Sequence, residues 1–112
     1  MPAITTRALI IGSGFSGLGM AIALKKQGVD FLILEKAEEI GGTWRDNTYP
    51  GCACDIPSHM YSFSFEPKAD WTHMWSFQPE IFDYLKGVAD KHGMRRGIRF
   101  GAHVERAQIG RA

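Results

Sequence analysis

Two short runs of apolar residues without polar alternation stand in the first third of the chain. Arg7 to Ile11 ("RALII") is followed by glycines, and Phe31 to Leu34 ("FLIL") is followed by Glu35. Such continuous apolar runs are typical of strands buried on both faces of a parallel sheet. The pattern therefore predicts two buried parallel strands near the N-terminus.

A helix is predicted between these strands. From Phe15, apolar residues recur at helical spacing until Lys25 and Lys26, whose charges suit the negative end of a helix dipole, and Gly28 then ends the helix. A strand, a helix and a strand within about 30 residues make a βαβ unit, whose connection is right-handed. We therefore predict an α/β fold built on a Rossmann-like βαβ unit.

The remainder of the chain divides into a long loop region, a helix and a final extended segment. Residues 37–78 are rich in Gly, Pro, Asn, Asp and aromatics without periodicity, and their aromatic density predicts a folded loop rather than disorder. A helix follows, with Pro79 in its first turn and Gly93 at its end. Residues 98–109 are expected to add a strand. The second helix should bury one face, formed by Ile81, Leu85, Val88 and Ala89.

Composition changes this picture little. A chain of 112 residues fits one small domain, and a net charge of +1 gives no reason to expect a nucleic acid partner. There is no apolar run of the roughly 18 to 20 residues that a membrane helix needs, and no basic region precedes the first apolar run, so we expect no transmembrane segment, no signal peptide and a cytoplasmic location. Cys52 and Cys54 are too close for a relaxed disulfide and lack further metal ligands, so we expect thiols without metal.

The turn between the first strand and the first helix carries a glycine fingerprint. Gly12, Gly14 and Gly17 follow the pattern G-x-G-x-x-G. In this pattern the first glycine permits a tight turn, the second lets a pyrophosphate approach the backbone, and the third lets the helix pack closely on the strand. Glu35, at the end of the second strand, is placed to accept hydrogen bonds from ribose hydroxyls. This context predicts dinucleotide binding at a helix N-terminus. The alternative is that the three glycines serve only the turn and its packing.

A second motif follows at residues 41–55, "GGTWRDNTYPGCACD". Its fixed positions resemble the pattern Gly-Gly-x-Trp, four variable residues, Tyr or Phe, Pro-Gly, three variable residues and Asp. That pattern belongs to the class B flavin-dependent monooxygenases, the Baeyer–Villiger monooxygenases in particular. Similarity continues through "DIPSHMYSFSFEP", "SFQPEIFDYL" and "IRF", up to about Val104. The matching residues are Gly41, Gly42, Trp44, Tyr49, Pro50, Gly51 and Asp55.

The resemblance implies FAD in an extended pose, with ribose hydroxyls on Glu35 and adenine near the backbone of Val104. Gly41 and Gly42 would let the backbone approach a flat ring. The phosphates would lie over Gly12, Ser13, Gly14, Phe15, Ser16 and Gly17. The flavin side would be lined by Phe15, Thr43, Trp44, Arg45, Asp46, Asp55 and Tyr61, and NADPH would meet Ala53, Cys54 and Asp55.

Asp55 is the residue to which the resemblance assigns a catalytic role, as the partner of a distant arginine. Two alternatives from the residues alone stay open: Asp55 as a cap before Ile56 and Pro57, and Trp44 and Tyr61 as core aromatics. His59 is expected to be a structural or surface histidine.

The implied reaction is reduction of FAD by NADPH, then reaction with O₂ and conversion of a ketone to an ester or lactone through a flavin peroxide. We expect residues 1–112 to be a partial FAD-binding domain, an N-terminal fragment without the NADPH-binding domain. Alone it should bind FAD weakly or not at all and show no turnover. The alternatives are a fragment of an N- or S-oxygenating monooxygenase and a non-catalytic nucleotide- or partner-binding module.

Overall fold

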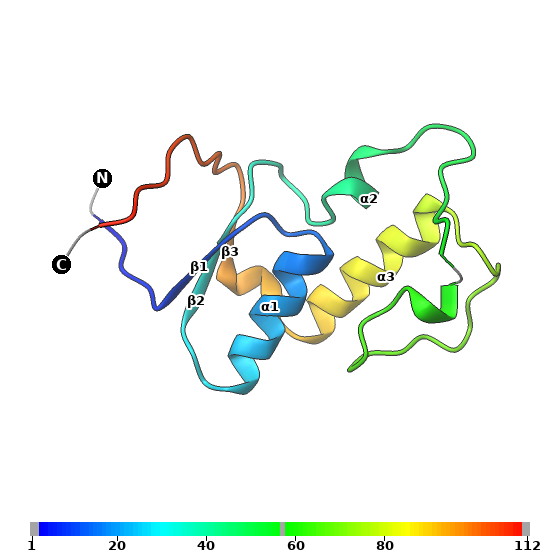
Figure 1. Cartoon of the computed structure of the whole chain (residues 1–112), viewed down its shortest axis with the longest axis horizontal. Coiled ribbons are helices and arrows are strands. Elements are labelled where there is room, and N and C mark those ends of the chain that lie inside the picture. The colour runs from blue at the N-terminus through cyan, green and yellow to red at the C-terminus, as the bar shows by residue number, and fades with distance from the viewer. Residues whose placement is uncertain (1–2, 57, 111–112) are drawn as a thin grey trace.

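The centre of the fold is a three-stranded parallel sheet. The computed structural model describes residues 3–56 and 58–110, and its strands are β1 (Ala8–Ile11), β2 (Phe31–Leu34) and β3 (Ile98–Arg99). The order is β1-β2-β3, and Leu9 of β1 lies opposite Leu32 of β2 in the parallel register (Figure 1). The helix α1 (Phe15–Lys26) connects β1 to β2. The predicted α/β fold and its βαβ unit are therefore confirmed.

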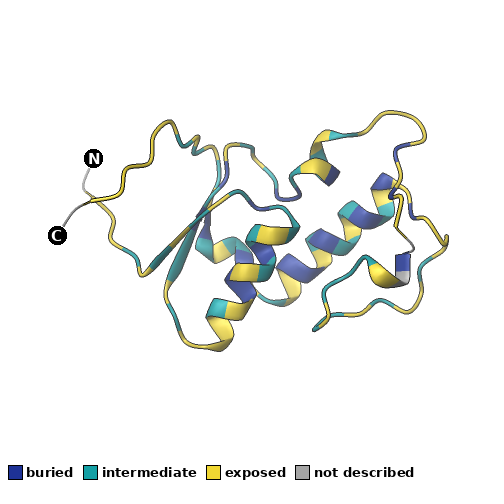
Figure 2. Cartoon of the chain, in the orientation of Figure 1, coloured by how far each residue is buried: buried dark blue, intermediate teal, exposed yellow. Residues whose placement is uncertain are grey.

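The long helix α3 (Gln78–Lys91) supplies much of the core. Its buried side chains include the four predicted for its inner face, and Pro79 lies in its first turn as expected. Gly93, just beyond its end, has a left-handed backbone (φ +67°), a conformation that glycine adopts without steric cost. A 3₁₀ turn, η2 (Met94–Gly97), then leads into β3. Figure 2 shows the buried residues of α3 along one side of the helix.

The two faces of the sheet differ in their cover. A Cβ added to Gly17 of α1 would lie 3.4 Å from Ile10 Cγ2, so Ile10 faces α1. Leu9 and Ile11 point to the opposite face, since successive residues of a strand alternate. They are 55% and 62% exposed. The prediction that the first strand is buried on both faces was therefore wrong, because only one face has a helix packed on it among the described residues.

The loop region is folded, as its aromatic content predicted. It contains two short elements that the sequence did not reveal, α2 (Thr43–Asp46) and η1 (Ser58–Met60). Tyr84 of α3 accepts a hydrogen bond from Phe63 N–H (2.9 Å) and donates one to Glu66 O (2.6 Å). Phe63 also stacks on Phe65 and lies against Gly19 of α1. The loop therefore covers both helices.

The final segment forms less strand than predicted. β3 contains only two residues, and the chain from Gly101 to Gly110 has no regular structure. Ile109 is 95% exposed. The predicted strand over residues 98–109 was wrong beyond Arg99. Gly101 N–H and Ala102 N–H still donate to Ala37 O (3.0 Å) and Glu35 O (2.9 Å), but the residues after them form no strand. The described segments before β1 and after β3 both extend away from the helices, to the left in Figure 1.

Candidate functional site

Each glycine of the fingerprint has a different structural setting. Gly12 has φ +94°, so it needs glycine for its backbone. A Cβ on Gly17 would lie only 2.1 Å from Gly12 O, so Gly17 needs glycine for packing. Gly14 has neither constraint: its φ is −80°, and the nearest atom to an added Cβ is Gly42 Cα at 3.8 Å. The fold itself therefore does not explain a glycine at position 14.

The second glycine motif packs directly on the first. Gly41 N–H donates to Ser13 O (3.0 Å), and a Cβ on Gly42 would lie 3.3 Å from Gly14 Cα. Gly41 and Gly42 have φ of +123° and +54°, values that β-carbon-bearing residues rarely adopt. The turn after β1 and the start of α2 thus form one continuous backbone surface.

Glu35 is the charged centre of this region. Its carboxylate is buried and accepts hydrogen bonds from Ser13 Oγ (2.5 Å), Ser13 N–H (3.1 Å) and Ala37 N–H (2.9 Å). Arg45 Nη1 lies 3.3 Å from Oε1. Burial alone would raise the pKa of Glu35, but the Ser13 and Ala37 hydrogen bonds and the Arg45 charge together lower it. Glu35 is therefore held ionised at neutral pH.

Arg45 and Asp46 extend this charge network. Arg45 forms two hydrogen bonds with the Asp46 carboxylate (2.7 and 3.0 Å) and donates a third to Glu39 O (2.8 Å). Arg45 therefore links Glu35 to Asp46, and all three residues line the same cavity.

Two adjoining cavities lie at the carboxyl ends of β1 and β2, where ligands bind in open parallel sheets. They share Ile11, Gly12, Gly14, Gly42 and Thr43, so they form one crevice. The first, about 370 Å³, is lined further by Ser13, Leu34, Glu35, Lys36, Arg45, Asp46, Ala102, His103 and Val104. The second, about 360 Å³, is lined further by Phe15, Ser16, Gly17, Gly41, Trp44 and Tyr61.

A further cavity of about 430 Å³ adjoins this crevice at Thr43, Trp44 and Tyr61. Trp44 Nε1 donates to the Tyr61 hydroxyl (3.0 Å), and the Phe15 and Tyr61 rings meet edge to face at 4.8 Å. Trp44 is buried and Tyr61 half-buried, so both contribute to the core and also line cavities. The remaining lining comes from Asn47, Tyr49, Cys52, Ala53, Cys54, Asp55 and Ile56.

The predicted residues at positions 52–55 lie in different environments. Cys52 and Cys54 are free thiols buried in the hydrophobic core, whereas Ala53 and Asp55 are exposed. Pro57, part of the alternative in which Asp55 caps a turn, lies outside the described residues. The side chain of His59 does as well.

Sequence reasoning missed the buried polar residues that hold the motif loop in place. Gln78 Nε2 donates to Trp44 O (2.5 Å), which ties α2 to the first turn of α3. The hydroxyls of Ser58 and Ser76 are buried and hydrogen-bonded to each other (2.5 Å). The sequence contained only one hint of these polar contacts: Gln78 stands beside Pro79, at the start of a predicted helix.

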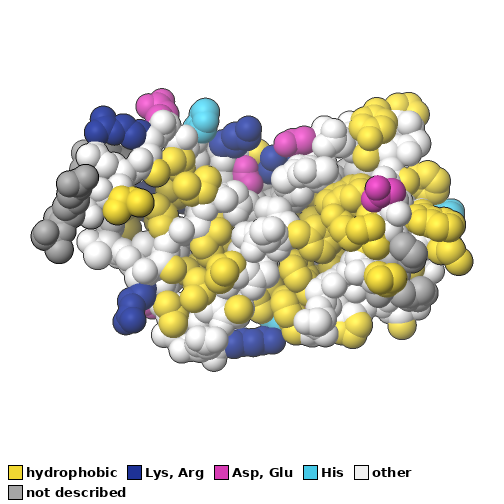
Figure 3. Space-filling model, viewed as in Figure 1, with side chains coloured by type: hydrophobic (Ala, Val, Ile, Leu, Met, Phe, Trp, Pro, Cys, Tyr) yellow, Lys and Arg dark blue, Asp and Glu magenta, His cyan; other side chains and the backbone are white. Residues whose placement is uncertain are grey.

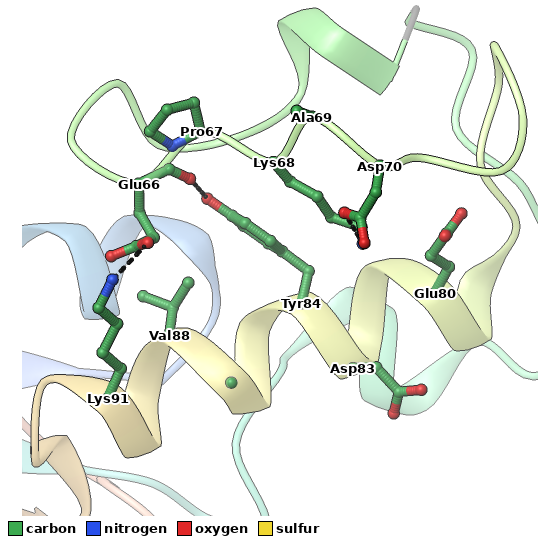
Figure 4. Close-up of a pocket in the computed structure, with 11 residues that line it drawn as sticks. Glu66, Pro67, Lys68, Ala69, Asp70, Glu80, Asp83, Tyr84, Val88 and Lys91 are labelled. Carbon is green, nitrogen blue, oxygen red and sulfur yellow. Dashed lines mark hydrogen bonds and ion pairs between the residues drawn. The ribbon is translucent and has the colours of Figure 1, made fainter.

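A separate cavity of about 490 Å³ lies between α3 and residues 66–70 (Figure 4). Glu66 forms an ion pair with Lys91 at one end of it (2.9 Å), and Tyr84 forms one wall. Its lining includes none of the predicted site residues. The candidate site is therefore the crevice at the ends of β1 and β2.

The parallel sheet, the glycine turn before α1 and the carboxylate after β2 together define a dinucleotide-binding domain of the Rossmann type. The chain belongs to the family described as NAD(P)-binding Rossmann-like domain, whose profile matches residues 10–86.

Similar proteins are flavin monooxygenases. A Baeyer–Villiger monooxygenase of Streptomyces coelicolor is 54% identical over 101 residues, which are 89% of this chain and 20% of that protein. The structure of an oxidized steroid monooxygenase bound to NADP matches 88% of this chain and 20% of its own, with a TM-score of 0.84 and 37% identity. A crystal structure of OTEMO in complex with FAD and NADP matches 89% of this chain and 20% of its own, with a TM-score of 0.81 and 32% identity.

The resemblance seen in the sequence is therefore confirmed, and the chain spans about one fifth of the length of these relatives. No helix in the described part of the chain is both long enough and apolar enough to cross a membrane.

Proposed function

We propose that this chain forms the FAD-binding N-terminal part of an NADPH- and O₂-dependent monooxygenase of the Baeyer–Villiger type. The observation that carries the proposal is Gly14. The fold tolerates a side chain there, yet Gly14 lines both cavities of the crevice, so a Cβ would occupy space that a ligand can use. Glycine at this position is what close approach of a pyrophosphate requires.

The surrounding residues fit FAD in its extended pose. The first N–H groups of α1, at Phe15, Ser16 and Gly17, have no capping side chain among the described residues and are free to bind phosphate. Glu35 is ionised and fixed in place, so it can accept hydrogen bonds from ribose hydroxyls. Val104 lies in the same cavity as Glu35, which supports the adenine at that end.

The resemblance put Arg45 and Asp46 on the flavin side. We propose instead that they lie at the ribose end of FAD, because Arg45 is paired with Glu35 and Asp46 is hydrogen-bonded to Arg45. The flavin would extend over Gly42, Trp44 and Tyr61. Asp55, Ala53 and Cys54 would adjoin it at the cavity where NADPH enters. When bound, FAD supplies the redox chemistry by which a ketone is oxygenated, and these residues orient it and exclude water.

Under this proposal, residues 1–112 form one partial domain. The enzyme to which that domain belongs acts on a small ketone and O₂. A cytoplasmic location is also part of the proposal.

The chain alone should contact FAD through the adenosine diphosphate half. We expect FAD at about 1 mM, a concentration suited to weak binding, to shift the amide NMR signals of Gly12, Ser13, Gly14 and Glu35. ADP should shift the same signals, whereas riboflavin, which lacks that half, should not. Equal shifts with riboflavin, or no shift at the glycine turn, would contradict the proposal.

The isolated chain should lose FAD on gel filtration and consume no NADPH in the presence of a ketone. The reason is that the described cavities are open to solvent and cover only one side of the cofactor. The measurement is flavin absorbance of the eluted protein together with NADPH absorbance over time. A yellow, active 112-residue protein would show that this chain is a complete enzyme rather than a part.

A further inference from the structure

Cys52 and Cys54 lie on a short extended segment that pairs with the residues before α3. The residue between the two cysteines forms an antiparallel bridge with the residue that precedes α3. On one side of this bridge, Cys54 N–H donates to Ser76 O (2.9 Å). On the other side, Gln78 N–H donates to Cys52 O (2.9 Å). Because side chains at i and i+2 of an extended segment point to the same side, the two thiols face the same way.

The two thiols also border a cavity. Cys52 and Cys54 are only 6% and 8% exposed, and both line the cavity of about 430 Å³ that adjoins the crevice at Trp44. The surface on the side that carries the loop after α2, on the right of Figure 3, is mainly hydrophobic with few charged side chains. The thiols therefore lie in an apolar environment that a small ion can reach through the cavity.

Each of the two sulfurs has its own hydrogen-bond donor. Ile56 N–H donates to Cys54 Sγ (3.4 Å). A hydrogen bond with Cys52, together with the charge that a Cys52 thiolate carries, raises the pKa of Tyr49, so the Tyr49 hydroxyl keeps its proton and donates it to the sulfur. Such donors stabilise a thiolate and hold a metal ligand in place. These contacts suit two metal-bound thiolates better than two apolar core side chains.

A disulfide does not fit this geometry. In an extended segment, Cα atoms two residues apart are separated by about 6.5 Å, and their Cβ atoms lie in parallel. The Cβ atoms of a disulfide are only about 4 Å apart, so closing the bond would bend the segment away from Ser76 and Gln78. A linear sulfur–metal–sulfur bridge with thiolate–metal bonds of about 2.3 Å spans about 4.6 Å. The two thiols can form such a bridge with much less movement.

The number and type of ligands select the metal. Zinc takes four ligands, and among the described residues no group of three or more His, Cys, Asp or Glu side chains could hold a metal ion. Calcium and magnesium need oxygen ligands. Thiols without metal were expected because further ligands are lacking, but copper(I) prefers soft sulfur ligands and is satisfied by two. Copper(I) is therefore the metal that fits this pair.

We propose that Cys52 and Cys54 form a two-coordinate site for copper(I) in the cavity beside Trp44. Each thiol loses its proton on binding, since cysteine binds a metal as the thiolate. Two protons leave as one cation enters, so the occupied site carries one negative charge. Ile56 N–H and the Tyr49 hydroxyl stabilise this charge. The site needs no FAD, so its test is independent of the proposed function.

The test is a competition for copper(I) between the reduced chain and bicinchoninate, a coloured copper(I) chelator, in oxygen-free buffer with ascorbate. We expect the chain to take a single copper ion from the chelator. Cys52→Ser and Cys54→Ser should each weaken binding by about 100-fold or more, because loss of a ligand costs more than loss of a supporting contact. Met60→Leu is the matched control and should leave binding unchanged, since Met60 carries another soft sulfur but is 75% exposed and does not line the cavity.

X-ray absorption at the copper edge identifies the ligands in the unmodified chain, without any variant. We expect two sulfur ligands and no nitrogen. The proposal is overturned if the chelator keeps all the copper, if a folded serine variant binds copper as tightly as the unmodified chain, or if Met60→Leu abolishes binding. A third ligand in the absorption spectrum would overturn it as well. So would a copper-dependent dimer in light scattering, because the metal would then lie between two chains. Circular dichroism checks the fold of the serine variants, and the absorption spectrum decides without them.

Discussion

Gly17→Ala is expected to destabilise the chain by about 2 to 4 kcal/mol, a large part of the stability of a small domain. The new Cβ would lie 2.1 Å from Gly12 O and 3.1 Å from the Gly12 carbonyl carbon. Both are backbone atoms, so relief requires α1 to move away from β1. Urea unfolding followed by circular dichroism measures the loss.

Gly87→Ala is the matched control. Gly87 also lies inside a helix, but nothing is within 4 Å of an added Cβ. Alanine there should stabilise the chain by about 0.5 to 1 kcal/mol through helix propensity. Equal effects of the two substitutions would show that α1 and β1 are not in close contact at the glycine turn.

Glu35→Gln should cost about 2 to 3 kcal/mol at pH 7, because buried charge-assisted hydrogen bonds are lost. The glutamine side chain has one acceptor oxygen where Glu35 presents two. Ser13, Ala37 and Arg45 all direct donors at that carboxylate. Arg45 would also lose the buried countercharge. Urea unfolding of the two proteins gives the difference.

The pH dependence of that difference is a second readout. The pKa of Glu35 is lowered in the folded chain from an ordinary value of about 4.5. Its ionisation therefore stabilises the fold above pH 4.5, and this contribution is lost as the pH falls through the folded pKa. The difference in unfolding free energy between the unmodified chain and the Glu35→Gln variant should therefore narrow as the pH falls below about 4.5. A difference independent of pH would mean that Glu35 is not the ionised centre of the network.

The sequence predicted the parts of the fold that local pattern controls. The α1 and α3 boundaries follow from capping residues and periodic apolar positions, and both agree with the structure. The exposure of Leu9 could not be predicted, because an apolar run indicates burial without showing which segments supply the cover. α2 has only four residues, too few for a periodic signal.

The sequence predicted which residues form the candidate site better than it predicted how those residues are arranged. The fingerprint spacing placed Gly12, Gly14 and Gly17 at one turn. Only the three-dimensional structure distinguishes a glycine required by its backbone conformation or by close packing from one that leaves room for a ligand. The sequence also did not show that Arg45 reaches Glu35, since that contact depends on how α2 packs on the first turn. Gln78 was missed for the same reason.

The most direct test of the account is the flavin content of a chimera in which this chain replaces the matching fifth of the S. coelicolor enzyme. We predict a near-stoichiometric yellow flavoprotein, and a folded but largely flavin-free protein with Gly14→Val, because the side chain would fill the space expected for pyrophosphate. A folded chimera that is colourless while its parent binds flavin would contradict the account, as would undiminished flavin in the Gly14→Val protein.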